Sequence, residues 1–193
     1  MSTPLIAVAL PQELNHEPLP FDFPIVFTGV GKLNAALALN DAIGQHQPSL
    51  VINFGTVGSI ANRASGLVEI AEVVQRDMDA VPLVERGITP FDDGPVRFQS
   101  GFPGARCGTG DSFVNEVDPW LIEQNVDVVD MELFALAMVC HRHDLPWRSF
   151  KYVTDDADGD AGDDWLERVH KGRQLFIEKL QEVAEMLAEL NAD

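Results

Sequence analysis

Three carboxylates in this 193-residue chain come directly after apolar segments that are typical of buried strands. Glu13 follows the apolar run at residues 5–10, and Glu132 and Asp155 follow the two apolar runs within the segment 127–158. In an open parallel sheet, ligands bind outside the carboxyl ends of the strands, so we expect these acids to face one crevice. Such acids can act as general acid and general base. A single one of them would more often be a surface or helix-capping residue.

The elements that must position these acids alternate along the chain between strand and helix patterns. Strands are predicted at residues 5–10, 24–28, 49–54, 105–108 and 148–154, and helices from residue 33 and at 117–124, 132–143 and 164–190. Residues 66–81 fit one or two strands at a partly exposed edge, and 82–103 should be irregular. The alternation predicts a single α/β domain over residues 1–193, with three layers and a central mixed, largely parallel sheet flanked by helices.

Two glycine clusters follow predicted strands, and each could form either a turn or a ligand-facing segment. Gly29 and Gly31 lack the third glycine of a dinucleotide-binding motif, so a tight turn and a ligand-facing loop are equally good interpretations. The second cluster, residues 55–59, combines two glycines with two hydroxyl side chains. This composition suits a close approach of the backbone to a polar ligand, although a plain turn explains the glycines equally well.

Composition excludes several classes of partner. The net charge is -18, from 31 acidic and 13 basic residues, and it repels phosphate backbones and anionic lipids. We therefore expect neither nucleic acid nor membrane as a partner. The first residues lack a basic segment, and Pro11 and Glu13 interrupt their apolar run, so a cytoplasmic location is expected.

Metals, cofactors and covalent nucleophiles are not predicted. Cys107 and Cys140 lie in apolar contexts typical of buried free thiols, and the five histidines show no metal-binding spacing. The acidic run from residue 156 to Glu167 nearly matches a calcium-binding loop, but the required glycine is displaced by one position. A solvated loop that begins a helix is the preferred interpretation. Acid-base chemistry is the remaining candidate.

Four groups of segments together resemble the nucleoside phosphorylase and nucleosidase superfamily. They are residues 29–36, 51–58, 108–114, and 128–132 with 153–158, and their order and spacing match over most of the chain. The resemblance is closest to the 5'-methylthioadenosine/S-adenosylhomocysteine nucleosidase branch, of which this chain would be a shortened member. It implies the fold of that superfamily and an N-ribosyl hydrolase activity on a small nucleoside, with water as the second reactant.

The resemblance also implies roles for the three acids. Asp155 matches the acid that binds the purine and protonates its N7, and Glu132 matches the acid that holds the ribose hydroxyls. Glu13 matches the acid that activates the attacking water, assisted by the hydroxyl of Thr56. An acid near the purine and a base near the water address the two ends of the barrier to N-glycosidic cleavage.

Further positions are carried over from the same resemblance. Met131 matches the residue that packs on the sugar, and Phe113 and Val114 match those that stack on the base and bond its edge. Gly31 and Gly55, from the matched glycine segments, complete the predicted substrate-binding set. Leu10 and Trp165 are candidates for the pocket that receives the 5' substituent. Relatives are commonly homodimers, and residues 82–103 are a candidate subunit contact.

Two positions bear on which nucleophile is used and which purine is bound. Phosphorylases of the superfamily use arginine two residues before the second glycine cluster, where this chain has Asn53, and this favours hydrolysis. Aspartate at position 155 favours a 6-aminopurine. The leading hypothesis is a purine nucleosidase that acts on an adenosine-type nucleoside such as 5'-methylthioadenosine, S-adenosylhomocysteine or 5'-deoxyadenosine. The alternatives are a purine nucleoside phosphorylase and a non-catalytic nucleoside-binding or storage relative.

Overall fold

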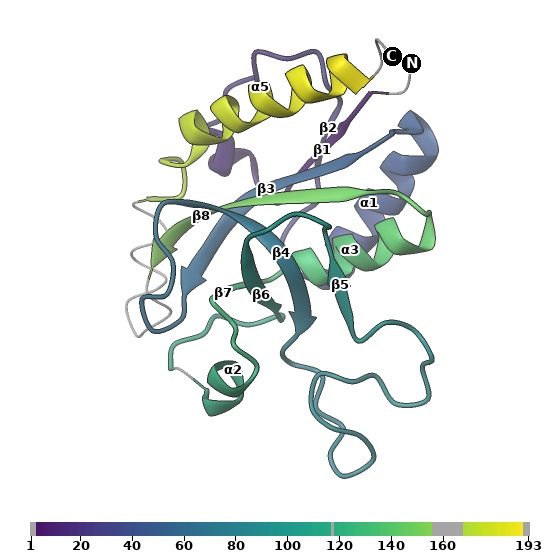
Figure 1. The fold of residues 1–193 in the computed structure, drawn as a ribbon, viewed down its shortest axis with the longest axis vertical. Helices are drawn as coiled ribbons and strands as arrows, with labels where there is room; N and C mark the ends of the chain where they lie inside the picture. Colours follow the sequence, from purple (N-terminus) through teal and green to yellow (C-terminus); the bar gives the residue numbers. More distant parts are fainter. Residues whose placement is uncertain (1–2, 117, 156–167, 191–193) are drawn as a thin grey trace.

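The computed structural model describes residues 3–116, 118–155 and 168–190, in which helices lie on both sides of an eight-stranded sheet (Figure 1). The strands are β1 (Leu5–Val8), β2 (Ile25–Phe27), β3 (Val51–Ser59), β4 (Leu67–Gln75), β5 (Arg97–Gln99), β6 (Ala105–Thr109), β7 (Val128–Asp130) and β8 (Trp147–Asp155). The helices are the 3-10 helix η1 (Pro11–Leu14), α1 (Lys32–His46), α2 (Pro119–Glu123), α3 (Leu133–Arg142) and α5 (Arg173–Leu190).

The sheet is mixed and largely parallel, as predicted. Its strand order is β2-β1-β3-β7-β6-β4-β5, and β8 pairs with both β3 and β4. The pairs β1–β2, β1–β3, β3–β8, β4–β6 and β6–β7 are parallel, whereas β3–β7, β4–β5 and β4–β8 are antiparallel. Because β8 links β3 to β4, the strands β3, β8, β4, β6 and β7 close a ring. The expectation of an open sheet was therefore incomplete.

Three layers follow from the burial of the strands on both faces. In β1, Leu5 and Ala7 pack in the cluster that contains α1 and α3, whereas Ile6 and Val8 pack in the cluster that contains α5. Figure 1 shows α5 on one side of the strands and α1 and α3 on the other. Phe176 of α5 stacks on a phenylalanine of β3, with ring centroids 4.2 Å apart. A strand apolar on both faces thus produces a sheet covered on both sides.

The second glycine cluster does not form a turn, so one of its two interpretations was wrong. Residues 55–59 continue β3, and they pair with β8 as far as Gly58, which lies opposite Asp155 after a shift in register. A side chain at Gly55 would place its Cβ 3.0 Å from Lys151 Nζ and 3.3 Å from Glu13 Oε1. The glycine therefore permits close packing inside the strand rather than a reversal of the chain.

Residues 66–81 contain a strand, β4, as predicted, but the prediction that it lies at a partly exposed edge was wrong. Strand β4 pairs with β5, β6 and β8, and its charged residues are satisfied by ion pairs with neighbouring strands. Arg148 Nε lies 2.8 Å from Glu69 Oε1, and Arg106 Nε lies 2.7 Å from Glu72 Oε1. The charges that suggested exposure instead bind cations across the sheet. The segment 82–103, predicted to be irregular, contains the short strand β5.

The predicted C-terminal helix at 164–190 is interrupted. Residues 169–172 form a turn, α5 begins at Arg173, and residues 164–167 lie outside the described ranges. A Cβ at Gly172 would lie 2.4 Å from the Cβ of Tyr152, so the turn packs closely on β8. The segment 156–167, for which a solvated loop was preferred over a calcium-binding loop, lies outside the described residues. Among the helices that the structure describes, none combines the length and apolar character needed to cross a bilayer.

Candidate active site

A cavity of about 350 Å³ opens beyond the carboxyl ends of several strands. Seven of the nine predicted site residues line it, namely Glu13, Thr56, Phe113, Val114, Met131, Glu132 and Asp155. Leu10 lines it too, whereas Trp165 lies outside the described residues. The other two predicted residues, Gly31 and Gly55, do not line the cavity. Gly31 N donates a hydrogen bond to Glu132, and a Cβ at Gly55 would lie 3.3 Å from Glu13 Oε1. The structure thus gathers three acids that are far apart in sequence around one small-molecule-sized space.

Glu13 is held in one orientation by three donors. It lies in η1 and is only 3% exposed. Its Oε2 accepts a hydrogen bond from Leu10 N at 3.0 Å, and its Oε1 accepts from Thr56 N at 2.9 Å and Thr56 Oγ1 at 3.1 Å. Burial raises the pKa of Glu13, although the positive charge of Lys151 and these hydrogen bonds oppose the rise. A fixed carboxylate of increased basicity suits a general base.

Glu132 connects the end of β7 to the turn before α1. It is the N-cap residue of α3, and its Oε1 accepts a hydrogen bond from Gly31 N at 3.0 Å. Gly31 has φ 92°, a conformation that favours glycine. Burial, together with the negative charge of Asp130, raises the pKa of Glu132 to about 7. The role of Gly31 is therefore to position the acid, and Glu132 changes charge near neutral pH.

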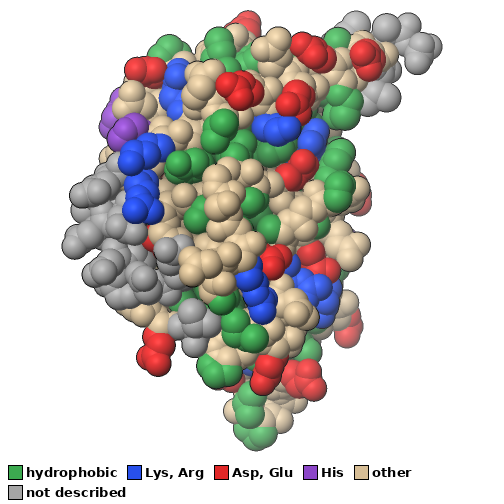
Figure 2. All heavy atoms as spheres, turned by 60° about the vertical axis from the view of Figure 1, so that its left-hand side comes forward, with side chains coloured by type: hydrophobic (Ala, Val, Ile, Leu, Met, Phe, Trp, Pro, Cys, Tyr) green, Lys and Arg blue, Asp and Glu red, His purple; other side chains and the backbone are tan. Residues whose placement is uncertain are grey.

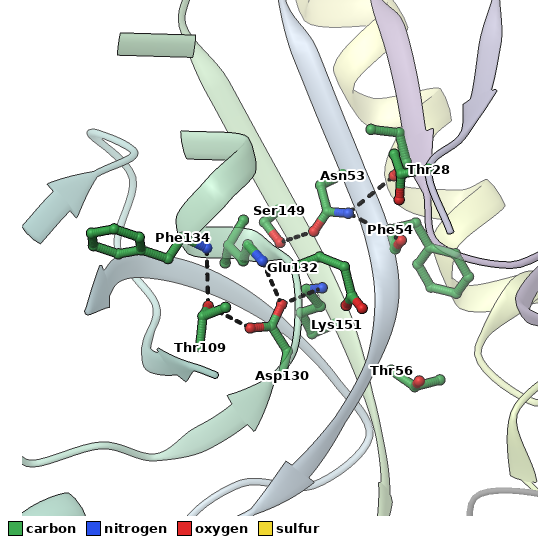
Figure 3. Close-up of polar contacts among 12 residues, drawn as sticks. Thr28, Asn53, Phe54, Thr56, Thr109, Asp130, Glu132, Phe134, Ser149 and Lys151 are labelled. Carbon is green, nitrogen blue, oxygen red and sulfur yellow. Dashed lines mark hydrogen bonds and ion pairs between the residues drawn. The ribbon is translucent and has the colours of Figure 1, made fainter. Parts of the chain in front are cut away.

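A buried ion pair beneath the acids was not predicted from the sequence. Lys151, 1% exposed, points from β8 to Asp130 at the end of β7, with Nζ 2.9 Å from Oδ2 (Figure 3). Asp130 also accepts hydrogen bonds from Thr109 Oγ1 at 2.5 Å and from Leu133 N at 2.9 Å. Burial acts to raise the pKa of Asp130, but Lys151 and these donors outweigh it and hold the pKa below its ordinary value.

The ion pair influences the acids that line the cavity. Burial acts to lower the pKa of Lys151, but the negative charges of Asp130 and Glu132 raise it, so the ammonium stays charged. That charge lowers the pKa of both Glu13 and Glu132, against the larger effect of their burial. The available signals in the sequence were a lysine in the middle of an apolar strand and an aspartate two residues before Glu132.

Asn53 serves the sheet rather than the cavity. Its Nδ2 donates to the carbonyl oxygen of Ala7 at 3.0 Å, and its Oδ1 accepts from Ser149 Oγ at 2.8 Å (Figure 3). It is 3% exposed and does not line the cavity. This position, where the resemblance places a phosphate-binding arginine in phosphorylases, is thus committed to bonds between strands.

Asp155 ends β8 and is 6% exposed. Its Oδ2 accepts a hydrogen bond from Thr154 Oγ1 at 2.8 Å. The shift in register between β3 and β8 places it opposite Gly58, another residue of the cavity wall. Phe113 contributes a half-exposed aromatic ring to the same cavity, whereas Val114 is 9% exposed. A carboxyl and an aromatic ring in one cavity suit a planar ligand with hydrogen-bonding edges.

The charged side chains on the surface include many acids, as the excess of acidic residues in the sequence leads one to expect. On the face shown in Figure 2, acidic side chains are interspersed with basic ones, and no broad basic patch covers it.

Fold and cavity together define an α/β protein with an acid-lined site for a small molecule at strand ends. A family model described as the phosphorylase superfamily matches residues 24–189. The chain belongs to the phosphorylase superfamily.

Known relatives and solved structures agree with this assignment. A 5'-methylthioadenosine/S-adenosylhomocysteine nucleosidase of Staphylococcus aureus (strain MRSA252) is 31% identical over 161 residues, covering 71% of this chain and 70% of the relative. A Helicobacter pylori MTAN mutant with 5'-methylthioadenosine in the active site has a TM-score of 0.84 at 17% identity, covering 96% of this chain and 99% of the other. The predicted resemblance is confirmed at the level of the superfamily.

A second activity is represented among structures with the same fold. A futalosine hydrolase mutant of the same Helicobacter pylori species has a TM-score of 0.83 at 16% identity, and the match covers 96% of this chain and 100% of that chain. The two TM-scores are almost equal, so the fold alone does not select between the activities named for these proteins. Substrate choice must come from the residues of the cavity.

Proposed function

We propose that this chain is a purine nucleosidase that hydrolyses the N-glycosidic bond of an adenosine-type nucleoside. The products would be adenine and the free ribose derivative, from a substrate such as 5'-methylthioadenosine, S-adenosylhomocysteine or 5'-deoxyadenosine. The observation that carries the proposal is the meeting of Glu13, Glu132 and Asp155 around one cavity. Membership of the phosphorylase superfamily and the nucleosidase names of its relatives support it.

The acids divide the reaction between them. As the C1'–N9 bond breaks, its electron pair goes to the purine, and Asp155 gives a proton to N7 so that a neutral base leaves. The sugar then develops positive charge, which the Glu132 carboxylate stabilises while it holds the ribose hydroxyls. Water attacks C1', and Glu13 accepts the proton that the water loses. The Thr56 hydroxyl, whose Oγ1 lies 3.1 Å from Glu13 Oε1, helps to orient the Glu13 carboxylate.

Water is preferred over phosphate as the nucleophile because Asn53 is bound within the sheet. Phosphorolysis nevertheless remains a second candidate on one observation. Arg76 is the one cationic side chain among the described residues that line the cavity, and guanidinium groups bind phosphate well. A nucleoside-binding protein without catalytic activity is a third possibility, which the same experiment addresses.

The test is a panel of nucleosides assayed for released base with and without inorganic phosphate. It should contain 5'-methylthioadenosine, S-adenosylhomocysteine, 5'-deoxyadenosine, inosine and futalosine. We expect adenine from at least one adenosine-type substrate without phosphate, and loss of that release in Asp155→Asn. Asp41→Asn, on an exposed part of α1, is the matched control. Base release that requires phosphate would indicate a phosphorylase, and binding without release would indicate a non-catalytic protein.

A homodimer is proposed as the working assembly. Large apolar side chains are exposed in two regions, Leu33 (72%) and Leu37 (60%) on α1, and Leu83 (69%) and Phe91 (96%) in the predicted contact segment. Exposed apolar groups of this kind are favourable to bury between subunits. Light scattering should give twice the mass of the chain, and the double substitution Leu83→Ser with Phe91→Ser should shift it to a monomer. A monomeric unmodified protein at working concentration would contradict the proposal.

A further inference from the structure

Two charged residues lie in the sequence segments that carry the family resemblance but have no part in the proposed reaction. Lys32 is the first residue of α1, and Asp111 lies two residues before Phe113. Neither lines the cavity, although residues next to them in the chain help to form the site. The contacts of Lys32 and Asp111 lead to a third residue, Asp77, which lies just after β4.

Asp77 joins Lys32 to Asp111 through both of its carboxylate oxygens. Its Oδ1 accepts a hydrogen bond from Lys32 Nζ at 2.5 Å, and its Oδ2 accepts one from Asp111 N at 2.8 Å. Asp111 Oδ1 in turn accepts from Lys32 N at 2.7 Å, so the three residues form a closed hydrogen-bonded ring. Burial acts to raise the pKa of Asp77, but the bonds from Lys32 and Asp111 outweigh it and hold the pKa below its ordinary value. Asp77 therefore stays charged at neutral pH.

The residue before Asp77 holds the same segment from the inner side. Arg76 is 5% exposed, and its Nη2 donates to the carbonyl oxygens of Gly110 and Ser112. Its Nη1 donates to Ser112 Oγ at 3.2 Å. A Cβ at Gly110 would lie 2.9 Å from Arg76 Cζ, so the backbone of the segment packs directly on the guanidinium. Residues 110–113 are thus bound on two sides by consecutive residues after β4.

The hydrogen-bonded ring connects two walls of the cavity. Val30, in the turn before α1, and Phe113 both line the cavity, and both side chains are about half-exposed. A Cβ at Gly31 would lie 3.2 Å from Asp111 Oδ1, which shows how closely the turn approaches the segment that carries Phe113. None of the three ring residues lines the cavity. The ring can therefore affect a ligand only by setting the positions of the residues that do line it.

We propose that Asp77 is a positioning residue, which holds Phe113 against the nucleoside base by fastening the Phe113 segment to the turn before α1. This inference rests on the proposed nucleosidase function and adds a residue to the same site. Stacking of an aromatic side chain on the base contributes about equally before and during bond cleavage, and the loss of such uniform binding raises KM without lowering kcat. Removal of Asp77 should therefore raise KM and leave kcat nearly unchanged.

The kinetic test is a double-mutant cycle between Asp77 and Phe113, with adenine release from 5'-methylthioadenosine as the readout. Asp77→Ala removes both acceptor oxygens and should raise KM by roughly tenfold, whereas Asp77→Asn keeps one acceptor and should raise it less. In a Phe113→Ala background, Asp77→Ala should change KM by less than about twofold. The matched control is Asp79→Ala, because Asp79 accepts a hydrogen bond from Val81 N within its own loop, and it should leave KM unchanged.

Hydrogen–deuterium exchange tests the positioning without any substrate. In Asp77→Ala, the backbone amides of residues 110–113 should exchange roughly fivefold faster or more than in the unmodified protein, because local opening of the segment becomes easier. The amides of α5, on the other side of the sheet, should keep their rates. Asp79→Ala should show no change at residues 110–113.

The two measurements separate the possible failures. Unchanged exchange at residues 110–113 in Asp77→Ala would overturn the positioning role. The same increase in KM with and without the Phe113 side chain would overturn it too, because the effect would then not pass through Phe113. If the protein releases no base, calorimetric binding of adenine replaces KM in the cycle, so failure of the proposed function is distinguished from failure of this inference.

Discussion

The folded protein disfavours ionisation of the Glu132 carboxyl. Glutamine at this position does not ionise, so Glu132→Gln avoids that unfavourable free energy. The side chain is 8% exposed, and burial with the charge of Asp130 raises its pKa from 4.5 to about 7. Glutamine keeps an oxygen that can accept the hydrogen bond from Gly31 N, at nearly the same size. The substitution therefore isolates the cost of charging this position.

The magnitude follows from the difference in pKa between the folded and unfolded chain. The folded protein holds the proton more tightly, so the free energy of unfolding of the unmodified protein falls as pH rises from about 4.5 to about 7. The full loss above that range is about 3 kcal/mol, because each pKa unit corresponds to about 1.4 kcal/mol. Glu132→Gln does not undergo this loss. Its advantage in stability should grow by roughly 2 to 3 kcal/mol between about pH 5 and pH 9.

Urea unfolding of both proteins at these two pH values measures the effect. The exposed Glu123, in α2, provides the control substitution Glu123→Gln, which should show no such growth. We also expect Glu132→Gln to lose nucleosidase activity while it gains stability at high pH, since functional sites often carry such costs. A stability difference that is the same at both pH values would refute the assignment of a raised pKa to Glu132.

Two further substitutions test the surroundings of the acids. Lys151→Met leaves the fully buried Asp130 side chain without its cation and should lower the free energy of unfolding by about 3 to 5 kcal/mol. Adding Asp130→Asn should restore part of that loss in urea unfolding, and no restoration would count against the ion pair. Gly55→Ala places a Cβ 3.0 Å from Lys151 Nζ and should lower kcat on the order of tenfold to a hundredfold. The control is Gly44→Ala, in an open part of α1, which should leave kcat unchanged and raise the free energy of unfolding by about 1 kcal/mol. Equal kcat values for the Gly55 and Gly44 variants would contradict the expected crowding at Gly55.

Strand ends and resemblance were sufficient to predict which residues meet at the cavity. Glu13 and Asp155 follow β1 and β8, which both pair in parallel with β3, so the strand-end argument brings them together. Glu132 follows β7, which pairs antiparallel with β3, so its place beside them was implied by the resemblance. The same reasoning gave the mixed, largely parallel sheet and its covering by helices on both faces. Local pattern is adequate here because buried parallel strands have a strong and simple signature.

Other features depend on contacts between distant residues and could not be predicted in this way. Lys151 looks like an ordinary charged residue in the sequence, and only the folded chain shows that it forms an ion pair with Asp130 at the end of β7. Gly55 and Gly58 suggested a turn, but pairing with β8 keeps them in a strand. The ring of strands likewise arises because β8 pairs with both β3 and β4. Arg76 was not singled out, because its place in the cavity wall becomes visible only when its neighbours are known.

The fate of oxygen from solvent water tests the central claim of hydrolysis most directly. The purified protein would be incubated with 5'-methylthioadenosine in oxygen-18 water containing phosphate. The mass of the sugar product would then be measured by mass spectrometry. The proposed roles of Glu13, as the base that activates water, and Asp155, as the purine proton donor, predict adenine and a free sugar that carries label from water at C1'. An unlabelled sugar 1-phosphate would contradict the account, because phosphate and not water would then have attacked the sugar.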